Sequence, residues 1–128
     1  MKHLKTCIVI SLDGFIARKD GDLNWMPGNI KKEISAAYEI PSVFIAGVNT
    51  YNMIFRNWGG WPYKSKKTFV VSHYDTNVTR KDNVTFLTDM PLRAINELKS
   101  SSETDIQVIG GGKFITSLIE ASLLDEIT

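Results

Sequence analysis

The sequence predicts an α/β protein with a mostly parallel central sheet that helices cover on both faces. The main observation is that short β-branched or aliphatic runs alternate with segments of helical spacing from end to end. Strands separated by helices need crossover connections, which favour parallel pairing and bury both faces of the sheet. The chain has 128 residues, of which 43% are hydrophobic and 23% are charged. This suits one globular domain over residues 1–128 and excludes a disordered chain or a coiled coil.

The first half of the chain is predicted to contain two strands and two helices. The first strand stops at Asp13-Gly14, a turn dipeptide, and the first helix stops before Pro41. Asn49 or Thr50 is expected to cap the second helix, because either side chain can accept a hydrogen bond from a free backbone N–H group. The predicted strands cover residues 6–12 and 42–46, a loop covers 18–29, and the first helix covers 30–38. The second helix is short and follows its cap as far as Phe55.

The second half of the chain repeats this alternation. Pro91 lies in the first turn of a predicted helix, where its missing N–H group is tolerated. Strands are predicted over 67–72, 84–87, 106–109 and 123–127, and helices over 91–99 and 113–121. No repeat of fixed period and no low-complexity linker interrupts the pattern, so a single domain is expected.

Charge and cysteine content exclude several classes of function. Lys plus Arg (15) nearly balance Asp plus Glu (14), so the chain lacks a broad positive charge for nucleic acid or an anionic membrane. Cys7 is the single cysteine, which excludes an internal disulfide, and we expect it to be buried in its apolar run. The apolar runs are far shorter than the ~20 residues that cross a bilayer, so a cytoplasmic protein is expected. His3 and His73 have no partner at metal-ligand spacing, and no metal site is predicted.

Two glycine-bearing segments follow predicted strands and are candidates for a phosphate site. They are Gly47-Val48-Asn49-Thr50 and Gly110-Gly111-Gly112. Glycine lets the backbone approach a ligand closely, and the following helix directs free N–H groups and its positive dipole end at an anion. Neither segment matches a spaced dinucleotide or Walker fingerprint, so a tight turn with close helix packing explains them equally well.

Asp13 and Trp25 are the other residues that suggest chemistry. Asp13 directly follows a predicted strand, where a carboxylate can orient a substrate or relay a proton, or can simply hold a turn. Trp25 is a large aromatic residue in a polar loop and is expected to line a pocket. Aromatic and basic residues before the third strand are expected to pack the loop or to be solvated, namely Trp58, Trp61, Tyr63, Lys64, Lys66 and Lys67.

The order of these segments resembles the dihydrofolate reductase-like group of proteins. Within this group, the chain is most similar to the reductase domain of the bifunctional deaminase-reductase of bacterial riboflavin biosynthesis and to its stand-alone relatives. The likeness covers essentially the whole chain and depends on weak motifs that occur in the expected order. These motifs are Ser11-Leu12-Asp13-Gly14 with Ile16-Ala17, Trp25, Gly47-Val48-Asn49-Thr50-Tyr51, Ser72-His73, Val108-Ile109-Gly110-Gly111-Gly112 and Leu123-Leu124-Asp125-Glu126.

The resemblance implies a three-layer, dihydrofolate reductase-like fold and an NADPH-dependent reductase. Its substrate would be a small pyrimidine- or pterin-like heterocycle, which receives a hydride from the cofactor. Asp13 would be the catalytic residue, and Leu12, Gly14 and Trp25 would surround the nicotinamide and the substrate. The residues that would contact NADPH are Gly47, Asn49, Thr50, Ser72, His73, Gly110, Gly111, Gly112 and Phe114.

Two residue positions depart from the family pattern. Val48 stands where an arginine usually pairs with the phosphates of the cofactor. His73, Lys66 or Lys113 would have to replace that arginine, or NADH or a different nucleotide would be preferred. The acid that protonates the pterin in dihydrofolate reductases is missing near Lys31, so folate reduction is not expected.

The C-terminal strands of the family are the third departure, because they are apparently missing after Thr128. This predicts a truncated chain, or a sheet edge that a second copy completes in a homodimer. Together, the departures keep open an alternative, a non-catalytic relative of the same fold that binds nucleotides or oligomerises.

Overall fold

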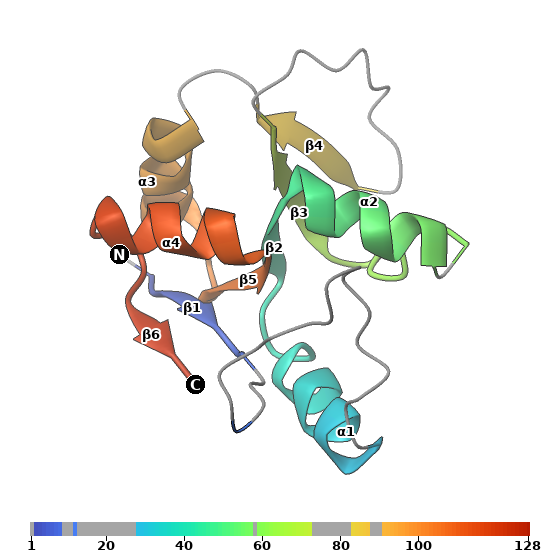
Figure 1. Ribbon diagram of the computed structural model, residues 1–128. Helices are drawn as coiled ribbons and strands as arrows, with labels where there is room; N and C mark the ends of the chain where they lie inside the picture. The colour runs from blue at the N-terminus through green and yellow to red at the C-terminus, as the bar shows by residue number, and fades with distance from the viewer. Residues whose placement is uncertain (1, 9–11, 13–27, 58, 73–82, 88–90) are drawn as a thin grey trace.

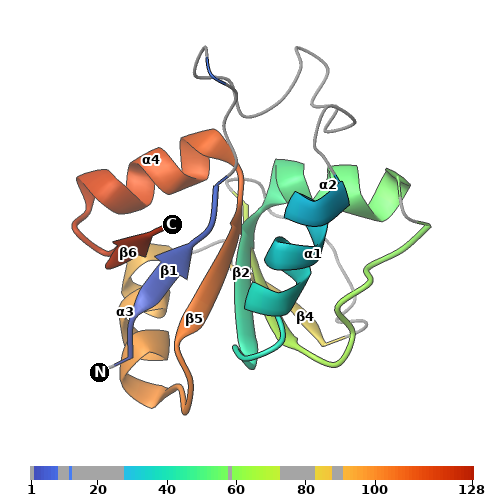
Figure 2. The same ribbon diagram turned by 90° about the horizontal axis from the view of Figure 1, so that it is seen from below.

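The computed structural model describes residues 2–8, 12, 28–57, 59–72, 83–87 and 91–128. In chain order its elements are β1 (Leu4–Thr6), α1 (Gly28–Ala37), β2 (Val43–Gly47), α2 (Val48–Asn57), β3 (Lys67–Val71), β4 (Val84–Leu87), α3 (Pro91–Ser101), β5 (Ile106–Gly110), α4 (Gly112–Glu120) and β6 (Glu126–Ile127). The strands form one sheet between two helical layers, with α3 and α4 on one face and α1 and α2 on the other (Figures 1 and 2).

The sheet has the strand order β4-β3-β2-β5-β1-β6, and every pairing between the described strands is parallel. This confirms the predicted α/β fold with a mostly parallel sheet. From β2 the chain moves outward to β3 and β4, whereas from β5 it moves past β1 to β6 on the other side. The direction of winding therefore changes between β2 and β5. In open parallel sheets, ligands bind beyond the carboxyl ends of the strands at such a point.

The larger hydrophobic core lies between the sheet and the α3–α4 layer. Alternate residues of the strands point into it because side chains in a strand alternate between the two faces. From the helical layer, Ile95 of α3 and Ile115 and Leu118 of α4 contribute buried side chains. The strand residues in this core are Leu4, Val43, Ile45, Phe69, Val71, Ile106 and Val108.

A second core, the Trp61 cluster, consists of Trp61, Val70 and Val84 and lies on the α2 side of the sheet. Trp61 is 1% exposed, and its indole Nε1 donates a hydrogen bond to Thr68 Oγ1 at 3.2 Å. Tyr63 packs on it with ring centroids 5.3 Å apart. Trp61 and Tyr63 thus pack the loop, as predicted, and Trp58 lies outside the described residues.

The first strand is shorter and begins earlier than predicted, at Leu4–Thr6 instead of residues 6–12. Its position is decided by β5, which begins opposite Leu4, and Thr6 Oγ1 donates a hydrogen bond to the Val108 carbonyl at 3.1 Å. After Thr6 the pairing with β5 ends, while the Ile8 N–H group still donates to the Thr128 carbonyl at 2.9 Å. Cys7 is half-buried rather than buried. Residues 9–11 lie outside the described residues.

The last strand is also shorter than predicted, because α4 ends in a specific cap. Ser122 has a positive φ of 57°. The Leu123 N–H group donates to the Leu118 carbonyl and the Ser122 N–H group to the Ile119 carbonyl, both at 3.0 Å. This is the Schellman arrangement, which satisfies the last helical carbonyls. Leu123 therefore belongs to the helix cap, and β6 begins only at Glu126.

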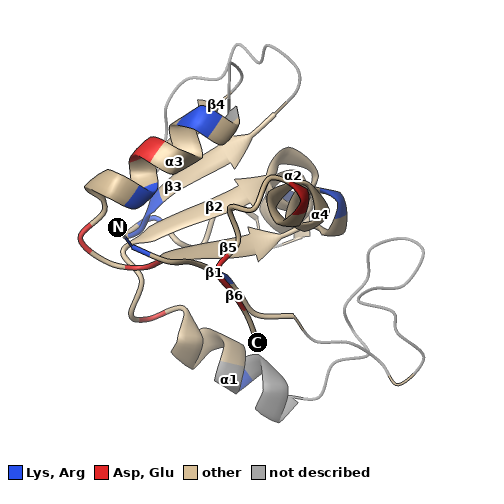
Figure 3. Ribbon diagram, turned by 90° about the vertical axis from the view of Figure 1, so that its left-hand side faces the viewer, with Lys and Arg blue, Asp and Glu red and all other residues tan. Residues whose placement is uncertain are grey.

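An ion pair connects α3 to the segment between α4 and β6. The Lys99 ammonium lies 2.7 Å from Asp125 Oδ2, and only 7% of the Lys99 side chain is exposed. Asp125 Oδ2 also accepts a hydrogen bond from the Leu4 N–H group at 2.8 Å. The bond to Lys99 and, to a smaller extent, the bond to the Leu4 N–H group hold the pKa of the Asp125 carboxyl below its usual value. The other charged residues of α3 and α4, whose positions along the ribbon are coloured in Figure 3, are exposed, namely Arg93, Glu97, Lys113 and Glu120.

Candidate functional site

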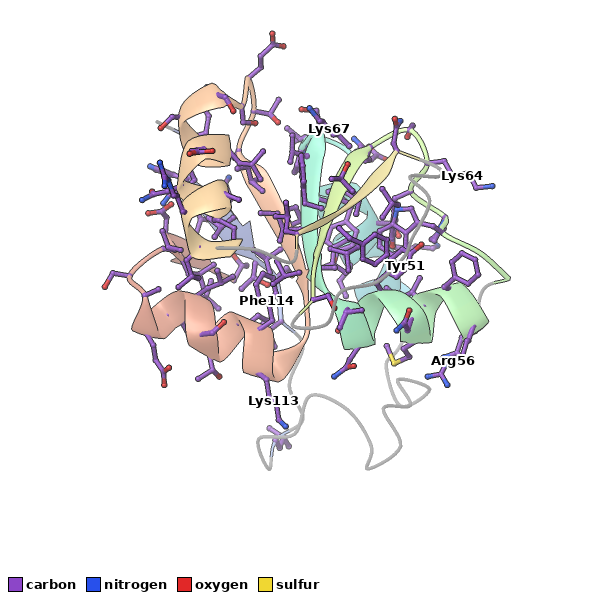
Figure 4. All side chains as sticks on the ribbon, turned by 90° about the horizontal axis from the view of Figure 1, so that it is seen from above. Tyr51, Arg56, Lys64, Lys67, Lys113 and Phe114 are labelled. Atoms are coloured by element: carbon purple, nitrogen blue, oxygen red, sulfur yellow. The ribbon has the colours of Figure 1, made fainter. Side chains whose placement is uncertain are left out.

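The carboxyl ends of β2 and β5 meet at the point where the winding of the sheet changes. Ala46 pairs with Gly110, and each strand runs directly into a helix that begins at Val48 or Gly112. From this point α2 and α4 run away in opposite directions (Figures 1 and 4). Two helix N-termini therefore lie side by side, and because the first N–H groups of a helix have no partner within that helix, this arrangement favours an anionic ligand.

The glycines at this junction are required by close packing. A Cβ atom on Gly111 would lie 2.8 Å from the hydroxyl oxygen of Thr50, and one on Gly47 would lie 3.2 Å from Phe114 Cβ. Gly110 has a positive φ of 142°, a conformation that side chains disfavour. The structure thus places Gly47, Thr50, Phe114 and the glycine turn (Gly110–Gly112) next to one another.

Asn49 and Thr50 do not cap α2, so this prediction is wrong. The helix begins at Val48, directly after β2, which places both residues inside its first turn. Thr50 faces the glycine turn. Asn49 instead lines an open depression of about 430 Å³ on the outer side of α2, together with Asn52, Phe55 and Arg56.

Ser72 lies at the same edge of the sheet, at the end of β3, which is separated from β5 and the glycine turn by β2. It directly follows β3, whose last residue, Val71, pairs with Gly47. Only 1% of Ser72 is exposed, and its backbone N–H group donates to the Leu87 carbonyl at 3.1 Å. Ser72 and the glycine-bearing ends of β2 and β5 therefore share one edge of the sheet.

The structure separates the lysines that were candidates to replace the missing arginine. Lys113 is exposed in the first turn of α4, and its side chain points away from the sheet, whereas Phe114 points toward it (Figure 4). Lys66 lies just before β3, at the opposite end of the sheet, where its ammonium donates to the Glu39 carbonyl at 2.7 Å. Lys66 therefore cannot serve this junction. Val48 packs against the Trp61 cluster.

Several predicted site residues lie outside the described residues, namely Asp13, Gly14, Trp25 and His73. Leu12 is described and is fully exposed. Within the described ranges, no group of His, Cys, Asp and Glu side chains gathers in the number that a metal ion needs. None of the described helices is long and apolar enough to span a membrane.

Gln107 received no role from the sequence, although it is the one polar residue in the run Ile106-Gln107-Val108-Ile109. In the structure it is buried on the central strand β5, three residues before Gly110. A polar residue that interrupts an apolar strand is the signal that can identify such a position.

Together, the parallel sheet, the change of winding and the glycine-bearing strand ends define an α/β protein of the dihydrofolate reductase-like fold. The chain matches the model of the RibD C-terminal domain family over residues 2–128, and it belongs to that family. It is 25% identical to the uncharacterized protein YwjB of Bacillus subtilis strain 168 over 122 residues, covering 93% of this chain and 70% of YwjB. It is also 25% identical over 134 residues to the uncharacterized protein YyaP of the same organism, and this match covers 93% of this chain and 68% of YyaP.

Solved structures show the same fold. A Shewanella sp. PV-4 protein assigned to riboflavin biosynthesis superposes with a TM-score of 0.78 and 30% identity, over 98% of this chain and 73% of its own. A Thermotoga maritima diaminohydroxyphosphoribosylaminopyrimidine deaminase/5-amino-6-(5-phosphoribosylamino)uracil reductase has a TM-score of 0.68 and 16% identity, over 94% of this chain and 42% of its own. Dihydrofolate reductase from Enterococcus faecalis, complexed with NADP(H), superposes with a TM-score of 0.60 and 20% identity, over 93% of this chain and 65% of its own.

Proposed function

We propose that this chain is a cytoplasmic NADPH-dependent reductase that transfers a hydride to a small pyrimidine- or pterin-like heterocycle. The observation that carries this proposal is the meeting of Gly47, Thr50 and the glycine turn at the junction of β2 and β5. Membership of the RibD C-terminal domain family supports it. The Thermotoga maritima protein of this fold is by its name a 5-amino-6-(5-phosphoribosylamino)uracil reductase, and the dihydrofolate reductase was solved with NADP(H).

The residues at the junction fit the diphosphate of a dinucleotide. A Cβ atom on Gly47 or Gly111 would meet Phe114 or Thr50, so the glycines keep the starts of α2 and α4 close together. Backbone N–H groups at two adjoining helix starts can donate to the oxygens of one diphosphate. Lys113 adds a positive charge in the first turn of α4, and this charge can act in place of the arginine that Val48 replaces. Ser72 lies one strand away, where the adenosine half would extend.

Bound NADPH would supply the hydride, and the chain would bind and orient both reactants and exclude water. We assign the orienting and proton-relaying role to Asp13 and the lining of the pocket to Leu12, Gly14 and Trp25, as the resemblance implies. Acid–base assistance of this kind contributes typically a hundredfold or more to a rate. An Asp13→Asn variant should therefore lose turnover and keep its affinity for the cofactor.

The first experiment is a fluorescence titration of the full chain with NADPH, with NADH in parallel. NADPH consumption is then followed with 5-amino-6-(5-phosphoribosylamino)uracil and, separately, with dihydrofolate. We expect micromolar binding of NADPH, weaker binding of NADH, and turnover of the pyrimidine. Asp13→Asn is the matched variant for the chemical step, because only turnover should change.

Three outcomes decide between the alternatives. Tight NADH binding with weak NADPH binding would mean that the 2′-phosphate is not recognised, and it would replace NADPH by NADH in the proposal. Binding of NADPH with no turnover of either compound would favour the non-catalytic nucleotide-binding relative. If neither nucleotide bound, the proposed reductase function would be wrong.

A further inference from the structure

Gln107 is a buried polar residue on the central strand β5, and its side chain makes a single long hydrogen bond within the part of the chain that the structure describes. Only 4% of the residue is exposed. Its Nε2 atom donates a long hydrogen bond of 3.4 Å to the carbonyl of the adjacent Val108, and its Oε1 atom accepts none from the described residues. Burial of an amide without partners is unfavourable, and such groups are usually completed by a ligand or an ordered water molecule.

The side chain of Gln107 belongs to the face of the sheet on which α1 and α2 lie. Its neighbours on β5, Ile106 and Val108, point into the larger core on the opposite face. Across the sheet, Gln107 pairs with Phe44 of β2 and with Lys5 of β1. The Trp61 cluster is built from β3, β4 and the segment between α2 and β3, and from β5 only Ile109 packs against it. On the first half of β5 and on β1, this face carries the polar residues Gln107 and Lys5 instead.

Tyr38 provides a second buried polar group next to Phe44. It follows α1, is 9% exposed, and its ring centroid lies 5.4 Å from that of Phe44. Its hydroxyl makes no hydrogen bond to any residue in the described ranges. Burial, with smaller effects of Tyr63 and Cys7, raises the pKa of this hydroxyl, so it remains a proton-bearing donor. Two polar groups that the described residues leave with unused hydrogen-bonding capacity therefore lie beside Phe44.

The position of Gln107 along β5 connects these groups to the glycine turn. The strand ends at Gly110, so Gln107 lies roughly 10 Å below the edge at which the cofactor is proposed to bind. A substrate held next to the nicotinamide on the α1 side of β5 would extend toward Gln107.

We propose that the carboxamide of Gln107, together with the Tyr38 hydroxyl, recognises the polar edge of the heterocyclic substrate. This inference rests on the proposed reductase function and names the substrate class more closely. A carboxamide presents an acceptor and two donors side by side, which complement the adjacent N–H and C=O groups of a lactam in a uracil-like ring. A site of this kind discriminates strongly against rings that lack these groups, because its own polar atoms would be left unpaired.

The test compares Gln107→Met, which keeps the side-chain volume and removes the hydrogen bonds, with Thr6→Val as the matched control. Thr6 is also buried, but its hydroxyl is already bonded to the Val108 carbonyl. The readouts are the urea midpoint, the affinity for NADPH, and KM and kcat with 5-amino-6-(5-phosphoribosylamino)uracil. Tyr38→Phe is the second variant, in case Gln107→Met does not fold.

We expect Gln107→Met to raise KM by roughly tenfold or more, the effect of about one lost hydrogen bond. Its urea midpoint and NADPH affinity should be unchanged or higher, whereas Thr6→Val should lower the midpoint and leave KM unchanged. Tyr38→Phe should raise KM in the same direction as Gln107→Met.

Two results would overturn the inference alone. If wild type reduces the pyrimidine and both variants retain its KM, the substrate does not reach these groups. If Gln107→Met lowers the urea midpoint as much as Thr6→Val, the carboxamide has a structural partner such as a buried water molecule. Wild type that binds NADPH and does not reduce the pyrimidine would instead contradict the proposed substrate class, and the inference with it.

Discussion

The hydroxyl oxygen of Thr50 lies 2.8 Å from the position that a Cβ atom would take on Gly111. This contact joins the first turn of α2 to the glycine turn that precedes α4, and these two segments are about sixty residues apart in the sequence. Since real Cβ contacts are longer than this, any side chain at residue 111 must displace Thr50. The distance therefore connects the identity of one residue directly to the shape of the proposed cofactor site.

Gly111→Ala is predicted to weaken NADPH binding by roughly tenfold or more and to destabilise the fold by about 1–3 kcal/mol, the usual effect of overpacking. The physical reason is that Thr50 has to move away from the turn. The double variant Gly111→Ala/Thr50→Ala removes the hydroxyl and should recover part of the lost stability. A urea-denaturation cycle of wild type, both single variants and the double variant measures this coupling. Strict additivity of the two single changes would contradict the predicted contact.

Gly47→Ala is predicted to have a smaller effect than Gly111→Ala. The new Cβ atom would lie 3.2 Å from Phe114 Cβ, which a shift of a few tenths of an ångström in α4 can accommodate. We expect a loss of about 1 kcal/mol in the free energy of unfolding and a measurable loss of NADPH affinity. Thermal denaturation measures the loss of stability, and calorimetric titration with NADPH measures the loss of affinity. An effect on NADPH affinity larger than that of Gly111→Ala would reverse the predicted order.

Lys113→Ala is predicted to weaken NADPH binding by roughly threefold to tenfold without loss of stability. A cation in the first turn of a helix is opposed by the helix dipole, so its removal should leave stability unchanged or slightly higher. Lys113→Arg is the control, because it retains the charge and should retain most of the affinity. Titrations at two salt concentrations provide the measurement, since a phosphate contact weakens with salt. If Lys113→Ala binds NADPH as tightly as wild type, Lys113 has no role at the phosphates.

Asp125→Asn is predicted to destabilise the fold by about 2 kcal/mol at neutral pH, because it leaves the buried Lys99 ammonium without its charged partner. The Asp125 pKa is lowered in the folded protein, so its contribution to stability is complete above the ordinary value of 3.8 and is lost as the pH falls through the folded pKa. Urea denaturation at neutral and acid pH should therefore show a difference between wild type and variant that shrinks below about pH 4.

Glu97→Gln is the matched control for this ion pair. Glu97 pairs with Arg93 at 3.6 Å on the exposed side of α3, where both side chains are more than two-thirds exposed. Exposed pairs contribute little, so the change in the free energy of unfolding should stay below about 0.5 kcal/mol. If Asp125→Asn changed the free energy of unfolding by an equally small amount, the Lys99 ammonium would not depend on the Asp125 carboxylate for its stabilisation.

The local sequence pattern predicted most elements with small errors at their ends. β4 lies at its predicted residues, and the strand before the glycine turn differs by one residue. Hydrophobic periodicity and Gly or Pro breakers are local properties, which is why they locate such segments well. The first strand was placed too late because the aliphatic run after Thr6 is a stronger local signal than Leu4, whereas pairing depends on where β5 lies.

Some features of the candidate site also follow from the local sequence, and others follow only from the tertiary structure. The sequence by itself determined that two glycine-bearing segments follow strands and open helices, and their order indicated the family. Only the tertiary structure decided that β2 and β5 are neighbours, that Thr50 rather than Asn49 contacts the glycine turn, and that Lys66 lies at the opposite end of the sheet. It also showed that Gln107 is buried with little hydrogen bonding. These facts depend on contacts between residues far apart in the chain, and no local pattern specifies which strands become neighbours or which side of a helix meets them.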